Sequence, residues 1–252
     1  TISANLDRMV KRDILNPEQK LMTLDNINTT VELNSSKTSD LVIEAVTENL
    51  DVKLKIFREL DQICSSKTML ATNTSSISIT EIAASTKRED KVIGMHFMNP
   101  VPIMKLVEVI RGRKTSDETT NTIIELSKTI NKIAIEVNDY PGFIANRILL
   151  PMINEAIEAL NTEVAKVKNI DSIMKIGMGH PMGPLQLADF IGLDVCLSIL
   201  KVMHKGLKDE KYAPSELLVN MVTSGKLGVK SDEGFYDYSK SKKAEVVAKQ
   251  FQ

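Results

Sequence analysis

The chain has 252 residues, 42% of them hydrophobic and 26% charged, a composition typical of a globular protein rather than a disordered or fibrous one. Its 32 basic and 33 acidic residues leave a formal net charge of −1, so we expect neither nucleic acid nor a membrane among its partners. No apolar stretch reaches membrane-spanning length, and Cys64 and Cys196 lack metal-ligand spacing, which predicts a cytoplasmic protein.

The first half of the chain alternates strand-like and helix-like segments. Short apolar runs rich in β-branched residues predict strands at 41–46, 68–72, 91–97, 105–110 and 132–137. Apolar residues at helical spacing predict helices at 51–64, near 79–85 and from 115 to about 130. Lys53 is expected on the charged face of the first helix, and Thr115 to Glu118 has the spacing of a capping box. Strands separated by helices predict a mostly parallel sheet in an α/β fold.

The pattern changes to helices after residue 138. The segment at 142–160 has a long apolar periodicity in which Pro151 is expected to produce a kink, and further helical segments follow it. We therefore expect two domains, a sheet domain at 1–138 and an all-helical domain at 139–252. The last dozen residues, SKKAEVVAKQFQ, are expected to form a frayed extension.

Polar side chains follow three successive predicted strands. Glu48 follows the first strand, Asn73 and Ser75 follow the second, and His96 lies near the end of the third. Ligands of open α/β sheets bind outside the carboxyl ends of the parallel strands. Glu48 by itself is better explained as the start of a helix, and Asn73 and Ser75 also suit ordinary turns. Taken together with His96, however, these residues indicate a functional site.

His96 and Glu108 suggest the chemistry of that site. Imidazole is the side chain best suited to exchanging a proton near neutral pH. A carboxylate on its other ring nitrogen fixes the tautomer and stabilises the imidazolium. Glu108 is in the next predicted strand, so the two side chains are expected to be in contact. No metal-ligand cluster or activated nucleophile accompanies them in the sequence, so the pair predicts proton transfer to or from a substrate oxygen without covalent catalysis.

Several long motifs resemble the L-3-hydroxyacyl-CoA dehydrogenase family, and most closely its bacterial 3-hydroxybutyryl-CoA members. They run in order over about residues 1–240: ATNTSSISITEIA, GMHFMNPVPIMKLVEVI, DYPGFIANRILLPMINEA, GHPMGPLQLADFIGLD and LGVKSDEGFYDY. The resemblance implies a Rossmann-like NAD-binding domain, a helical domain that forms a homodimer, and an active site between them. It also implies an oxidoreductase that interconverts a 3-hydroxyacyl-CoA and a 3-oxoacyl-CoA with NAD, with NADP as an alternative cofactor.

The resemblance extends to individual residues. His96 matches the catalytic histidine and Glu108 the glutamate that orients it. Ser75 matches a hydroxyl that contacts the substrate oxygen, and Asn146 an amide at the reacting end of the substrate. The remaining matches are cofactor contacts at Glu48, Lys53, Asn73, Ser75 and Asn99, and contacts to the CoA group at Asn5 and Arg12.

One feature of the family is missing from these residues. The family begins with a strand and a GxGxxG turn that holds the cofactor pyrophosphate at a helix N-terminus, and the sequence contains no such motif. We therefore expect the chain to be a fragment of a longer protein and to bind NAD weakly by itself. Two alternatives remain open at this point: a truncated, non-catalytic dimeric relative, or a dehydrogenase of another small 3-hydroxy acid.

Overall fold

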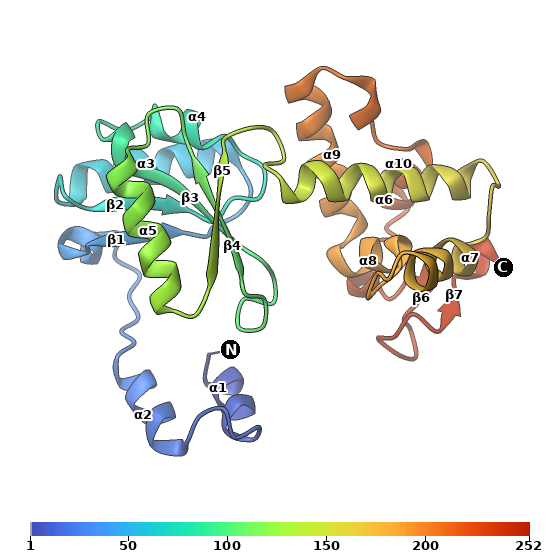
Figure 1. Cartoon of the computed structure of the whole chain (residues 1–252), viewed down its shortest axis with the longest axis horizontal. Helices are drawn as coiled ribbons and strands as arrows, with labels where there is room; N and C mark the ends of the chain where they lie inside the picture. The colour runs from blue at the N-terminus through green and yellow to red at the C-terminus, as the bar shows by residue number, and fades with distance from the viewer. Residues whose placement is uncertain (1) are drawn as a thin grey trace.

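The computed structural model describes residues 2–252 and shows a sheet-containing part and a helical part joined by one linker (Figure 1). A five-stranded sheet precedes a set of packed helices, so the predicted fold class is confirmed. Among the described residues, no helix is both long enough and apolar enough to span a membrane.

The sheet has the strand order β1–β2–β3–β4–β5. The strands are β1 (Leu41–Glu44), β2 (Met69–Thr72), β3 (Val92–Phe97), β4 (Leu106–Arg111) and β5 (Ile133–Asn138). The pairs β1–β2, β2–β3 and β4–β5 are parallel, whereas β3 and β4 are antiparallel. A short turn joins β3 directly to β4, and such a connection permits only an antiparallel pair. The sheet is therefore mostly parallel, as predicted.

Helices cover both faces of the sheet because alternate strand residues point in opposite directions. On one face, α3 (Leu50–Ile63) and α4 (Ile79–Ala83) bury a cluster that includes Ile110 of β4. On the other face, α5 (Asp117–Thr129) packs on a cluster that includes Val109. Each strand of this part is thus fixed in position by apolar contacts on at least one face.

The start of α5 differs by one residue from the predicted capping box. The N-cap is Ser116, whose side chain accepts a hydrogen bond from the Thr119 N–H. The predicted capping residue, Thr115, uses its hydroxyl elsewhere: it accepts from the Gly112 N–H and donates to the Val92 carbonyl oxygen. Both residues can cap a helix, and the contact with β3 decides between them.

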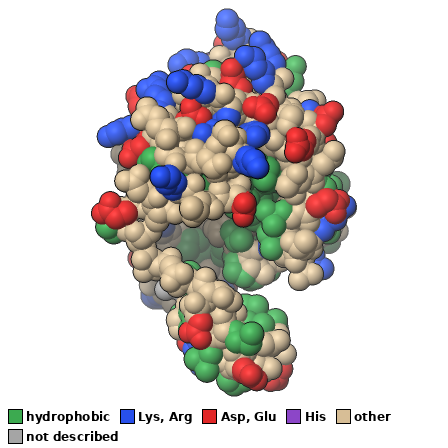
Figure 2. All heavy atoms as spheres, turned by 90° about the vertical axis from the view of Figure 1, so that its left-hand side faces the viewer, with side chains coloured by type: hydrophobic (Ala, Val, Ile, Leu, Met, Phe, Trp, Pro, Cys, Tyr) green, Lys and Arg blue, Asp and Glu red, His purple; other side chains and the backbone are tan. Residues whose placement is uncertain are grey.

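The first two helices form an arm below the sheet (Figure 1). They are α1 (Ile2–Val10) and α2 (Pro17–Asp25), and the 3₁₀ helix η1 (Leu33–Thr38) leads from the arm into β1. Asn16 and Gln19 form a reciprocal capping box at the start of α2. Figure 2 shows the arm projecting from the body of the molecule, with apolar side chains on its surface.

The second part of the chain packs helices around one apolar core. Its helices are α6 (Ala145–Asn161), α7 (Val167–Ser172), α8 (Pro184–Ile191), α9 (Leu193–Leu207) and α10 (Glu216–Thr223). Helix α6 contains Pro151 in its interior and continues beyond it. The short remaining elements of the chain are η2 (Glu89–Lys91), the π-helix η3 (Ile173–Gly177), η4 (Glu210–Tyr212), η5 (Val229–Ser231), β6 (Tyr236–Asp237), β7 (Val246–Val247) and η6 (Lys249–Phe251).

The C-terminal segment packs on the helices, and the prediction of a frayed extension was wrong. Strand β7 pairs with β6, and the rings of Phe235 and Phe251 lie 5.6 Å apart.

The carboxylate of Asp189 in α8 accepts hydrogen bonds from the Phe235 and Tyr236 N–H groups. Burial raises the pKa of Asp189 to about 7 in spite of these donors. Gly234 permits this approach, because an added Cβ would lie 1.9 Å from the Asp189 Oδ1.

Candidate active site

The predicted acid–base pair lies between two adjacent strands. His96 of β3 is directly opposite Glu108 of β4 in the antiparallel register, so both side chains point to the same face. The His96 Nδ1 is 2.7 Å from the Glu108 Oε2, and the two residues are only 7% and 3% exposed. The predicted contact is therefore present. It leaves the Nε2 atom as the ring nitrogen available for exchanging a proton with a ligand.

The second carboxylate oxygen of Glu108 lies at the N-terminus of α6. The Oε1 atom accepts hydrogen bonds from the Ile144 N–H at 3.2 Å and the Ala145 N–H at 3.0 Å. These N–H groups have no partner within the helix and lie at the positive end of its dipole. Burial acts to raise the pKa of Glu108, but the hydrogen bonds from His96 and from these amides outweigh it and hold the pKa below its usual value. Glu108 is therefore a carboxylate at neutral pH.

The loop after β2 is held to Glu48 and to the start of α6 through the backbone of Ser75. The Glu48 Oε1 accepts hydrogen bonds from the Ser75 N–H at 2.9 Å and the Ser76 N–H at 3.0 Å. The Asn146 amide donates to the Ser75 carbonyl oxygen at 2.9 Å. Within residues 2–252 these contacts leave the Ser75 hydroxyl uncommitted. The structure thus brings Glu48, Ser75 and Asn146 together, and it assigns to Asn49, not Glu48, the start of α3.

Lys53 is placed differently from the prediction. Its side chain is 1% exposed, and its ammonium lies 2.8 Å from the Glu44 Oε1 and 3.6 Å from the Glu48 Oε2. The expected position on the charged face of α3 was wrong, because Lys53 shares the buried face with Phe57 and Leu60. This geometry does not support a direct contact between the Lys53 ammonium and a cofactor. The ammonium instead holds two carboxylates at the end of β1.

The two asparagines predicted as cofactor contacts lie in different surroundings. The Asn73 Oδ1 accepts a hydrogen bond from the Phe97 N–H at 2.9 Å, which ties the end of β2 to the end of β3. The Asn73 amide N–H groups remain available at the rim of the sheet. Asn99 instead lines a hollow beneath the turn between β3 and β4. It is therefore grouped with the residues predicted to contact CoA.

That hollow, which we call the α1 hollow, lies between α1 and the β3–β4 turn. It has a volume of about 530 Å³, and its lining includes the predicted residues Asn5 and Arg12. Arg8 also lines it, although this residue was not among the predicted contacts to CoA. The spacing of Asn5, Arg8 and Arg12 places all three on one face of a helix, which is the signal that identifies Arg8.

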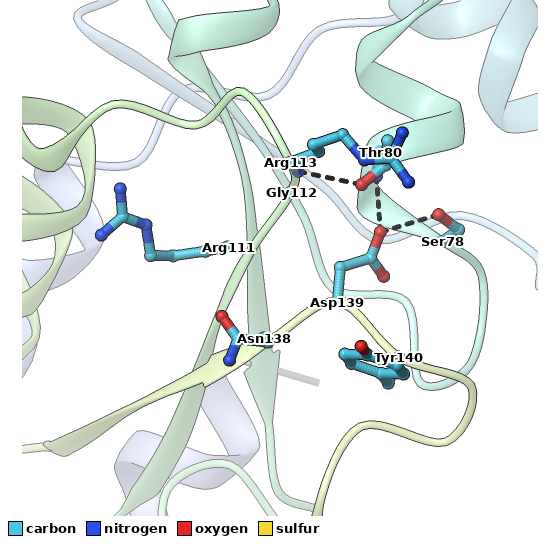
Figure 3. Close-up of a pocket in the computed structure, with 8 residues that line it drawn as sticks. All are labelled: Ser78, Thr80, Arg111, Gly112, Arg113, Asn138, Asp139 and Tyr140. Atoms are coloured by element: carbon cyan, nitrogen blue, oxygen red, sulfur yellow. Dashed lines mark hydrogen bonds between the residues drawn. The ribbon is translucent and has the colours of Figure 1, made fainter.

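A second hollow lies at the other end of the β3–β4 pair. It has a volume of about 640 Å³ and is lined by Ser78, Thr80, Arg111, Gly112, Arg113, Asn138, Asp139 and Tyr140. Figure 3 shows that Asp139 points to Ser78 and Thr80, with which it forms hydrogen bonds. Arg111 points away from them, and it pairs with Asp117 at 2.6 Å. Thr80 also accepts a hydrogen bond from the Arg113 N–H, so Asp139, Ser78 and Thr80 are bonded within the lining, and none of the predicted site residues lines this hollow.

Known proteins that resemble the chain fall in one family. The model of the 3-hydroxyacyl-CoA dehydrogenase NAD-binding domain matches residues 1–140, and that of the C-terminal domain matches residues 142–238. A probable 3-hydroxybutyryl-CoA dehydrogenase of Bacillus subtilis is 57% identical over 215 residues, which are 85% of this chain and 75% of that protein. A 3-hydroxybutyryl-CoA dehydrogenase of Clostridioides difficile is 50% identical over 239 residues, 95% of this chain and 85% of that protein.

Solved structures share the fold. The crystal structure of (S)-3-hydroxybutyryl-CoA dehydrogenase from Ralstonia eutropha matches with a TM-score of 0.92 and 47% identity, over 94% of this chain and 84% of that chain. These matches confirm the resemblance seen in the sequence motifs. Since the two family models together span both parts of the chain, the chain belongs to the 3-hydroxyacyl-CoA dehydrogenase family.

Proposed function

We propose that the protein is an NAD-dependent dehydrogenase that interconverts 3-hydroxybutyryl-CoA and acetoacetyl-CoA. The observation that carries this proposal is the buried contact of 2.7 Å between His96 and Glu108, beside the loop that carries Ser75. The family supports the cofactor and the reaction, and the relatives from Bacillus subtilis, Clostridioides difficile and Ralstonia eutropha support the four-carbon substrate.

In this function His96 is the acid and base of the reaction. For oxidation of the alcohol, the neutral imidazole removes the 3-hydroxyl proton at its Nε2 atom; for reduction, the imidazolium returns it. Glu108 holds the Nδ1–H and offsets the positive charge on the ring in a site from which water is largely excluded. The Ser75 hydroxyl donates a hydrogen bond to the same substrate oxygen, and the Asn146 amide maintains the position of the Ser75 loop.

The rim of the sheet fits the nicotinamide cofactor. A nicotinamide cofactor held at this rim would supply the hydride acceptor for oxidation of the alcohol at C3 and, in its reduced form, the hydride donor for reduction of the ketone. The ends of β1, β2 and β3 lie side by side and present the Glu48 carboxylate, the Asn73 amide and the Ser75 hydroxyl. Ligands of open α/β sheets bind at this edge. Lys53 supports this rim indirectly, through Glu44 and Glu48.

The α1 hollow is the proposed binding site for the CoA group. Its arginines, Arg8 and Arg12, provide cations for phosphate groups, and Asn5 and Asn99 provide hydrogen-bonding amides. Apolar residues such as Ile14 and Ile103 complete the lining and suit the adenine and pantetheine portions. The hollow begins at the turn that follows β3, so a thioester bound there extends toward His96 at the end of that strand.

We further propose a division into two domains, a homodimer and a cytoplasmic location. We take residues 1–138 as the cofactor domain and residues 139–252 as the helical domain. Apolar side chains of the helical domain are strongly exposed, and they support a homodimer through that domain: Val164, Ile173, Ile176, Met178 and Phe190. The two buried cysteines are free, and free cysteines suit a reducing environment, which supports a cytoplasmic location.

Acetoacetyl-CoA is expected to be reduced by the full-length protein with NADH, whereas free acetoacetate is expected to be a far poorer substrate. The CoA group contributes binding energy far from the reacting carbon, and that energy orients the carbonyl group toward His96. The loss of NADH absorbance measures both rates. Equal turnover of the two compounds would contradict the acyl-CoA assignment and indicate a dehydrogenase of small 3-hydroxy acids; no turnover and no NADH binding would indicate a non-catalytic relative.

The Arg12→Ala variant is expected to raise KM for acetoacetyl-CoA roughly tenfold, as expected for the loss of one charge-assisted contact to phosphate. Neither KM for NADH nor kcat is expected to change, since Arg12 lies in the hollow and away from His96. Lys11→Ala is the matched control, because Lys11 is the neighbouring cation and does not line the hollow. If both variants bind the thioester as the unmodified protein does, the CoA group binds elsewhere.

A further inference from the structure

One short segment of the linker contacts His96, Glu108 and the loop that carries Ser75. The Phe143 ring lies 6.0 Å from the His96 ring, centre to centre, at an angle of 58°. The next two N–H groups, of Ile144 and Ala145, bind the Glu108 Oε1. The Asn146 amide then binds the Ser75 carbonyl oxygen. The first turn of the helical domain therefore holds the imidazole, the carboxylate and the serine loop of the sheet domain.

The backbone of this segment has an unusual conformation. Gly142 and Phe143 have φ angles of 80° and 50°, both in the left-handed region. A bulky side chain rarely adopts this region, and it is held there only when the surrounding structure compensates. At Gly142 a side chain would be strained by the left-handed φ, and its Cβ would lie 2.5 Å from the Met203 Sδ, so Met203 would also have to move. Two successive left-handed residues turn the chain back from the end of β5 so that α6 begins beside Glu108.

The side chain of Phe143 shows what compensates for this conformation. Although the residue is in the linker, it is 1% exposed and belongs to the core cluster of the sheet domain, together with Phe57 and Ile110. Its ring lies beside the imidazole at a tilt of 58°, and His96 is only 7% exposed. A linker that only joined two domains would not require an aromatic residue in this conformation.

We propose that Phe143 is a positioning residue for the acid–base pair, and that residues 142–146 make the geometry of that pair depend on the placement of the helical domain. Phe143 limits rotation of the His96 ring, while the α6 amides fix the carboxylate that the ring must meet. Movement of α6 relative to the sheet therefore weakens the hydrogen bond of the pair and the position of Ser75 together. This inference rests on the proposed function for its catalytic meaning, but the coupling itself is a property of the fold.

The test compares Phe143→Leu with Phe57→Leu in the full-length protein. The two substitutions remove the same ring from the same core cluster, but only Phe143 packs against His96. Phe143→Leu is expected to lower kcat for acetoacetyl-CoA about tenfold, as expected for a small misplacement of a catalytic group, with KM changed less than twofold. Its pH–rate profile is expected to shift. Phe57→Leu is expected to lower stability similarly and to leave kcat and the profile unchanged.

A second measurement separates this inference from the function. The chain has three histidines, so the His96 ring signals in an NMR spectrum are assigned by comparison with a His96→Gln variant. Phe143→Leu is expected to move these signals and their pH titration, and Phe57→Leu is expected to leave them in place, whether or not the protein turns over acetoacetyl-CoA. If Phe143→Leu is insoluble, Phe143→Met makes the same test. Identical His96 signals in both variants would overturn the proposal and leave Phe143 as a core residue only.

Discussion

Replacing His96 with glutamine is expected to lower kcat for acetoacetyl-CoA reduction by about a hundredfold to ten-thousandfold, the usual loss when a general acid–base group is removed. Glutamine retains an amide that can donate a hydrogen bond to the buried Glu108 carboxylate, so the site is not left with an unpaired charge. Because the substitution removes proton transfer and leaves the α1 hollow intact, binding of acetoacetyl-CoA should change little. Steady-state kinetics by NADH absorbance measure the first quantity, and calorimetric titration measures the second.

The chain offers a matched control for this substitution. His204 near the end of α9 is half-buried and lies 3.2 Å from the exposed Glu210, so His204→Gln changes the same residue type away from the site. It is expected to retain full activity. A His96→Gln enzyme that kept more than a tenth of the wild-type kcat would exclude His96 as the acid and base. In that case the 2.7 Å contact with Glu108 would be a structural feature of the β3–β4 pair.

The Lys53→Met variant is expected to lose about 3–5 kcal/mol of unfolding free energy, the typical cost of removing one partner from a buried ion pair. The Lys53 ammonium is within 3.0 Å of both Glu44 carboxylate oxygens, and Glu44 is 5% exposed. Without the ammonium, the carboxylate keeps only the hydrogen bonds from Thr72 and the Val46 N–H. The destabilisation should be measured by urea denaturation at neutral pH.

Two further variants show whether the charge or the packing is responsible. Lys55→Met changes an exposed lysine two residues along the same helix and is expected to alter stability by less than about 0.5 kcal/mol. The double variant Lys53→Met/Glu44→Gln removes both charges and should recover a large part of the loss, because no buried charge is then left unpaired. Equal stability of Lys53→Met and Lys55→Met would show that the buried pair contributes little to the fold.

The α/β fold class and the contact between His96 and Glu108 could be predicted from the sequence, because both depend on short-range rules. The apolar periodicities of β3 and β4 are clear, and the turn between them is short, so the strands must be adjacent and antiparallel. His96 and Glu108 are polar residues inside two such strands. Because a buried polar side chain needs a polar partner, the two were expected to be in contact. The resemblance added the expected substrate class and the expected roles of Ser75 and Asn146.

The positions of Lys53 and Arg8 could have been predicted from the sequence but were not. Lys53, Phe57 and Leu60 recur at helical spacing, so Lys53 could have been assigned to the buried face of α3. Its charge favoured the opposite assignment, since lysine is rarely buried without a partner. The partner, Glu44, precedes the helix in β1, and only the docking of α3 on the strand brings the two together. Similarly, Arg8 lies four residues before Arg12, a spacing that suggests a shared face, but nothing local shows what the two side chains contact.

How the two parts of the chain meet at the site could not be predicted from the sequence. The tertiary structure placed Asn99 in the α1 hollow with Arg12, since the turn after β3 lines that hollow together with the arm. It also directed the N–H groups at the start of α6 to Glu108, and it held Phe143 in a left-handed conformation against His96. Such contacts join residues far apart in the chain, and their energies come from packing and from the dielectric environment. Local sequence preferences contain neither quantity, so these features follow only from the folded chain.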